Sequence, residues 1–67
     1  MSDHPQIDRI HEISAQIHGR PSEDFRRGVF AEACKDLGFK GDAATPELMD
    51  KAVEIAEREL AQHSHVM

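Results

Sequence analysis

The sequence predicts an all-α fold, a small three-helix bundle with short loops and a flexible C-terminal tail. Apolar residues recur at spacings of three and four in three separate segments, which is the period of an amphipathic helix. Residues that start or stop helices separate these segments, and no stretch shows the alternation or the turn dipeptides of a β-hairpin. We expect helices near 4–18, 22–37 and 46–62 in a single domain, 1–62, with the tail at 63–67.

The first helix is predicted from its cap and its isoleucines. Asp3 accepts hydrogen bonds from the free amides of the first turn, and Pro5 is tolerated because those amides have no helical partner. One stripe of the helix carries Ile7, Ile10, Ile13 and Ile17. Gly19 then ends the helix, since glycine readily adopts the left-handed conformation of a helix stop.

The second helix is predicted between Ser22 as its cap and Gly38 as its stop, with Phe39 placed for the hydrophobic contact of a Schellman ending. Its apolar face consists of Phe25, Val29, Phe30, Ala33, Cys34 and Leu37. Arg26 lies within this face, so we expect it to extend to solvent or to pair with an acid on a neighbouring helix.

Thr45-Pro46-Glu47 is the clearest helix start in the chain, because it combines a cap, a proline at the first helical position and an acid. The apolar arc of this third helix consists of Leu48, Met49, Ala52, Val53, Ile55, Ala56 and Leu60. We also expect two ion pairs along the helix, Glu47–Lys51 and Glu54–Arg58, since residues four apart are neighbours.

The apolar arcs of the second and third helices are wider than a helix packed on one side needs. A middle helix packed against two neighbours accounts for this width, which favours a monomer; a homodimer that buries the excess is the alternative. The residues expected inside the core are Ile10, Ile17, Val29, Phe30, Ala33, Leu37, Ala52, Ile55 and Ala56.

The composition limits the cellular compartment and the kinds of partner that we expect for this protein. The single cysteine excludes an internal disulfide and, with no signal peptide visible, favours a cytoplasmic protein. No apolar run is long enough to span a bilayer, so we expect no membrane association. The chain has a net charge of −5 and neither tyrosine nor tryptophan, which makes it a poor nucleic-acid binder.

The five histidines require metal binding to be considered. His4, His11 and His18 cannot share one ion, because seven residues rise about 10.5 Å along a helix. Removal of Met1 would leave Ser2-Asp3-His4, whose four nitrogens suit Cu(II) or Ni(II). The candidate metal ligands are His4, Glu59, His63 and His65, with half-exposed or frayed residues as the simpler interpretation.

Catalysis has little support in the sequence, and we expect neither an enzyme nor a cofactor. Cys34 lies far from the positive N-terminus of its helix, so an inert buried thiol is the simpler interpretation. No nucleophile elbow and no glycine-rich phosphate loop are present.

We therefore expect a non-enzymatic accessory, regulatory or inhibitory domain that acts by protein–protein interaction; a small metal-binding protein is the alternative. Residues 41–67 carry six acids against Lys51 and Arg58. Asp50, Glu54 and Glu57, here called the acidic ridge, should lie in solvent opposite the core, where they either meet a basic partner or simply keep the protein soluble.

Overall fold

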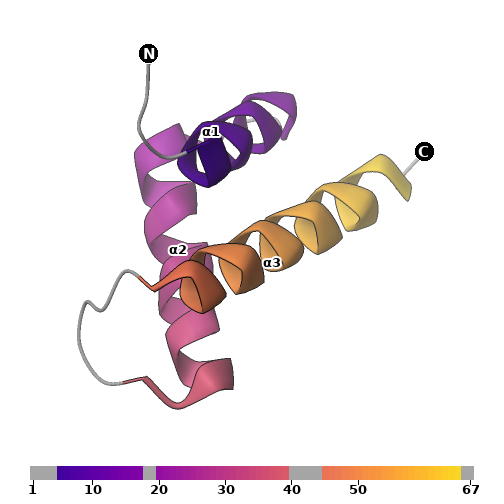
Figure 1. Ribbon diagram of the computed structural model, residues 1–67. Coiled ribbons are helices and arrows are strands. Elements are labelled where there is room, and N and C mark those ends of the chain that lie inside the picture. Colours follow the sequence, from indigo (N-terminus) through magenta and orange to yellow (C-terminus); the bar gives the residue numbers. More distant parts are fainter. Residues whose placement is uncertain (1–4, 18–19, 40–44, 66–67) are drawn as a thin grey trace.

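The computed structural model describes residues 5–17, 20–39 and 45–65, the side chains of the last segment as far as His63. These residues form three helices: α1, Pro5–Gln16, α2, Ser22–Leu37, and α3, Pro46–His65 (Figure 1). No strand occurs in the part of the chain described. The predicted three-helix bundle is confirmed.

Two of the predicted helix ends are confirmed by their hydrogen bonds. At the start of α3, the backbone N–H of Leu48 donates to Thr45 Oγ1 over 3.1 Å. At the end of α2, Gly38 has a φ of 76°, a left-handed conformation that favours glycine. Its N–H donates to the carbonyl of Lys35, and the N–H of Phe39 donates to that of Cys34. Together these bonds form the expected Schellman ending.

The cap of α2 differs from the expectation. Ser22 is the first helical residue rather than the cap, and Pro21, at the cap position, makes no side-chain hydrogen bond. The reason is that the Pro21 carbonyl already accepts from the N–H of Phe25 over 3.0 Å, which closes the first helical turn ahead of Ser22. The caps expected at Asp3 and Gly19 lie outside the described residues.

The C-terminal ends of α1 and α3 also differ from the expectation by a few residues. The last described helical residue of α1 is Gln16. The N–H of Ile17 then donates to the Ser14 carbonyl over 3.1 Å, a hydrogen bond between residues three apart that makes a tighter turn than the α-helix. Helix α3 extends to His65, beyond the expected end at Gln62. No glycine or proline follows Gln62 to stop it.

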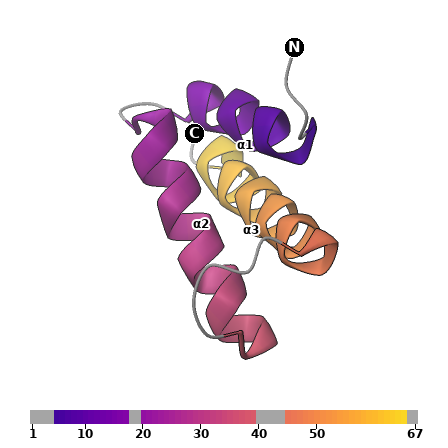
Figure 2. The same cartoon turned by 60° about the vertical axis from the view of Figure 1, so that its left-hand side comes forward.

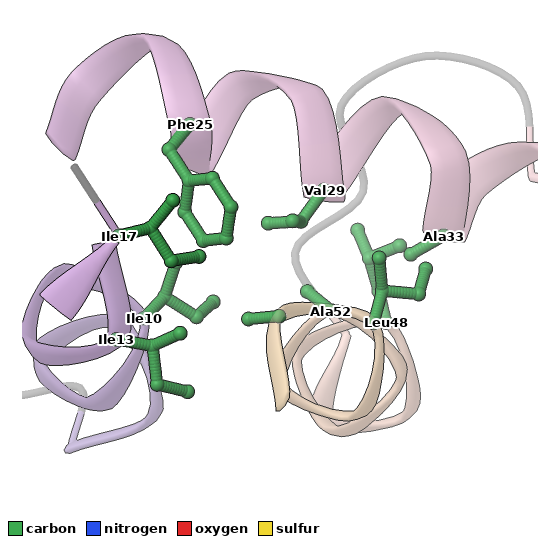
Figure 3. Close-up of a cluster of buried hydrophobic side chains, with 10 residues drawn as sticks. Ile10, Ile13, Ile17, Phe25, Val29, Ala33, Leu48 and Ala52 are labelled. Atoms are coloured by element: carbon green, nitrogen blue, oxygen red, sulfur yellow. The ribbon is translucent and has the colours of Figure 1, made fainter. Parts of the chain in front are cut away.

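Helix α2 lies across both α1 and α3. Figure 3 shows α1 and α3 side by side on the same side of α2, with side chains of all three directed into the space between them. Figures 1 and 2 show that the last turn of α2 extends past both neighbours. Among the described residues, none of the helices is both long and apolar enough to cross a membrane.

The hydrophobic core has two parts that meet beneath α2. Phe25 is directed from α2 toward Ile17 and Ile10 of α1, whereas Val29 and Ala33 face α3 (Figure 3). The buried hydrophobic residues are Ile10, Ile13, Ile17, Phe25, Val29, Ala33, Leu48, Met49, Ala52, Ile55 and Ala56. Seven of the nine residues expected in the core are therefore buried, all but Phe30 and Leu37.

Leu37 is the clear error in the predicted core. Its exposed fraction is 38%, because it lies on the last turn of α2, which extends past α1 and α3. Phe30 is half-buried and packs against the edge of the core. The apolar period of α2 therefore continues beyond the part of the helix that its neighbours cover.

Candidate functional site

A surface groove of about 520 Å³ lies where the first turns of α1 and α3 approach the middle of α2. We call it the α2 groove. The side chains that line it are Ile7, Arg26, Arg27, Phe30, Ala31, Cys34, Leu48 and Met49. Its surface is mostly apolar, and the charged side chains among its described lining residues are two adjacent arginines.

The wide apolar arc of α2 produces this groove. Phe25, Val29 and Ala33 share one stripe and are buried against α1 and α3. Phe30 and Cys34 each follow a stripe residue by one position, a turn of about 100° around the helix axis. They are half-buried and pack against the edge of the core. The excess apolar width that the sequence predicted therefore lies in the groove wall.

Arg26 contacts α1 rather than an acid. Its Nη1 donates to His11 Nε2 over 2.9 Å, and both side chains are half-buried. The expected pairing with an acid on a neighbouring helix is not found among the described residues, because the α1 residue within reach is an imidazole. Because arginine carries only donors, the ring nitrogen Nε2 of His11 is the acceptor of this bond. The bond positions the guanidinium without neutralising its charge.

Neither arginine of the groove pairs with a carboxylate among the described residues. The ion pairs found there use Arg9, Arg20 and Lys51 instead. Arg27 is exposed at the rim of the groove. No acidic side chain from the described part of the chain lines the groove, although acids outnumber Lys and Arg by 13 to 8 in the full sequence. The groove is thus a locally cationic, apolar surface on an acidic protein.

A second hollow, of about 240 Å³, lies at the other edge of α2. Its lining includes Arg20, Phe25 and Glu59. The guanidinium of Arg20 lies 5.8 Å from the centre of the Phe25 ring and 3.9 Å from Glu59. Arg20 and Glu59 therefore pair with each other there, whereas Glu32, which also lines the hollow, forms no ion pair with a described residue.

The acidic ridge lies on the exposed side of α3, as expected. Two of its three carboxylates have basic partners: Glu54 lies 3.2 Å from Lys51 and Glu57 lies 3.5 Å from Arg9 of α1. Asp50 is exposed and forms no ion pair with a described residue. The charge that the ridge offers to a partner is smaller than the number of acids suggests.

The local ion pairs predicted along α3 do not form. Lys51 lies 3.6 Å from Asp36 of α2 and 3.2 Å from Glu54, and neither Glu47–Lys51 nor Glu54–Arg58 occurs. The reason is that α2 brings a carboxylate to Lys51 from across the helix pair. A tertiary contact has displaced a pairing that depends only on spacing.

The candidate metal ligands are only partly described. Glu59 is half-buried and paired with Arg20, and His63 is exposed. His4 and the side chain of His65 lie outside the described residues. Within the described part of the chain, no three His, Cys, Asp or Glu side chains gather in a metal-binding arrangement. The metal site stays a prediction.

Comparison with known proteins gives no relative: no protein-family model matches the chain, and no curated protein or solved structure matches it significantly. The groove is therefore interpreted from its own residues. The sequence signal that could have located it was the width of the α2 arc together with the arginine inside that arc.

Proposed function

We propose that this protein is a non-enzymatic docking domain, active in the cytoplasm, that binds another protein through the α2 groove. The observation that supports the proposal is an open apolar groove beside a core that is already complete. Residues such as Ile10, Ile13 and Ala52 are fully buried without any contribution from a further chain. Of the apolar groove residues, Leu48 and Met49 belong to that core, whereas Phe30 and Cys34 lie at its edge and Ala31 is exposed.

Apolar surface that stays exposed to water is unfavourable in free energy. Burial of this surface against a partner would stabilise the complex by roughly 25 cal/mol for each Å² of apolar area removed from water. A contiguous apolar surface with polar groups at its rim is the usual mark of an interaction site. Here the rim includes Arg27, and the apolar surface includes the half-buried Ile7 and Phe30. The lining that the structure describes contains neither a hydroxyl nor a carboxylate, which favours binding over acid–base chemistry.

Site-specific photo-crosslinking in the source cells tests the proposal. Three exposed alanines allow a matched comparison: Ala31 lies in the groove, Ala15 lies on the outer side of α1, and Ala61 lies on α3. Each is replaced in turn by a photoreactive phenylalanine analogue. Because all three are exposed helical positions, none of the replacements should disturb the core.

We expect a discrete adduct of higher mass from position 31 and none from position 15. An adduct from position 61 without one from position 31 would move the docking surface to the exposed side of α3. No adduct from position 31 under any growth condition would contradict the proposal.

A further inference from the structure

We infer that the α2 groove receives an amphipathic helix of a partner protein, and that acidic residues flank the apolar face of that helix. The inference rests on the proposed docking function and specifies the chemistry of the partner. Three features carry it: the length of the groove, the charge of its rim and the way Arg26 is held.

The length of the groove suits a helix. On α2 its lining runs from Arg26 to Cys34, which corresponds to about 12 Å at 1.5 Å per residue. A helix presents side chains at i, i+4 and i+7 over a similar distance of about 10.5 Å. Ile7 of α1 and Leu48 of α3 form the remaining walls. A fourth helix could thus pack against all three helices of the domain.

The charge of the rim selects an acidic partner. Among the residues that the structure describes, its charged side chains are Arg26 and Arg27, and neither pairs with a described carboxylate. A basic helix would bring like charges together beside an apolar surface, where the dielectric screening is weak. An acidic helix would form charge-assisted hydrogen bonds there, with the two-donor geometry in which arginine binds carboxylates.

Arg26 is held in place before any partner arrives. One of its guanidinium nitrogens, Nη1, bonds to His11. A guanidinium has five N–H donors, so most remain free for a carboxylate. Because the acceptor is a ring nitrogen of His11 and not a carboxylate, the bond restricts the side chain without placing a negative charge beside the guanidinium. A side chain restricted in advance loses less conformational entropy on binding.

Matched helical peptides test the inference on the full-length protein. Three peptides share one apolar face, with leucine at i, i+4 and i+7, and differ only in the flanking positions, which are all Glu, all Gln or all Lys. Affinity is measured by fluorescence anisotropy over a salt series. Alkylation of Cys34, the only thiol in the chain and a residue of the groove lining, reports whether the peptide occupies the groove.

We expect the Glu peptide to bind about fivefold more tightly than the Gln peptide, to slow Cys34 alkylation and to weaken as salt rises. The Lys peptide should bind least. Two variants locate the interaction, each with a control of the same chemistry. Arg27→Glu should weaken the Glu peptide, whereas Arg58→Glu, at an exposed α3 position outside the groove, should not. Ala31→Glu should weaken all three peptides, and Ala15→Glu none.

Several results would overturn the inference. Equal affinity for the Glu and Lys peptides would remove the charge selection, and failure of all three to bind would remove the helix. Stronger protection of Cys34 by decanoate than by the Glu peptide would assign the groove to a small amphiphile. A dimer at tens of micromolar in sedimentation, with Cys34 protected before any peptide is added, would assign it to a second copy of the chain. An adduct at position 31 with a basic partner segment would refute the inference and leave the docking function standing.

Discussion

Arg26 and His11 form a side-chain hydrogen bond that joins α1 to α2, with 2.9 Å between Nη1 and Nε2. The two residues are 15 positions apart in the sequence and half-buried in the structure. The bond links the helix that carries the groove to the helix that forms one of its walls. It therefore contributes both to the fold and to the shape of the candidate site.

A double-mutant cycle measures this bond. His11→Ala and Arg26→Ala should each destabilise the protein, and the coupling between them should be about 1 kcal/mol, the usual net value of an internal hydrogen bond. Urea denaturation followed by circular dichroism gives the four free energies of unfolding. Additive effects of the two changes would mean that the contact contributes nothing in solution.

Gly28→Ala should stabilise the protein by about 0.5–1 kcal/mol. Gly28 is an exposed residue inside α2, and a Cβ added there meets nothing within 4 Å. Alanine would lose less backbone entropy on folding than glycine does. The matched change is Gly38→Ala, where the φ of 76° should make alanine cost about 1–2 kcal/mol. Thermal unfolding of both variants should give shifts of opposite sign, and shifts of the same sign would contradict the assignment.

Truncation of Leu37 should matter much less than its place in the apolar period suggests. With 38% of Leu37 exposed, Leu37→Ala should cost less than about 1 kcal/mol, rather than the 2–5 kcal/mol of a buried leucine. Ile13 is fully buried, so even Ile13→Val should cost about 0.5–1.5 kcal/mol. Urea midpoints rank the two, and a larger loss for Leu37→Ala would show that another surface covers it in solution.

The acidic ridge offers a separate test once a partner has been captured. On the hypothesis that it steers a basic partner, Asp50→Asn with Glu57→Gln should slow association and reduce its dependence on salt. Asp50 should account for most of the effect, because Glu57 already lies 3.5 Å from Arg9. Stopped-flow measurements over a salt series give both quantities. Unchanged rates and an unchanged salt slope would leave the ridge with a role in solubility alone.

Sequence reasoning was most successful where the determining interactions are local. The start of α3 at Pro46 and the stop of α2 at Gly38 depend on atoms within four or five residues, and both were predicted correctly. The buried stripe of α2 followed in the same way from the helical period. By contrast, the end of α1 and the cap of α2 were misplaced, because Ile17 bonds to the Ser14 carbonyl and does not continue the helix, and the Pro21 carbonyl closes the first turn of α2.

The candidate site could be predicted only in part. The wide α2 arc and Arg26 inside it were visible in the sequence, and both are now part of the groove. The partner of Arg26 was not predictable, because several charged and polar side chains lie at helical positions from which they could reach Arg26. Its selection of His11 depends on where α1 crosses α2.

The sequence by itself determined that three helices form, where two of their ends lie and which stripe of each is apolar. The reason is that helix period, caps and stops act over one or two turns of a single segment. The tertiary structure decided which part of each wide arc is covered: Ala33 is fully buried, Phe30 is left at the groove and Leu37 extends past both neighbours. It also paired Lys51 with Asp36 across two helices. These outcomes depend on where the helices cross, and the packing of all three sets those crossings together.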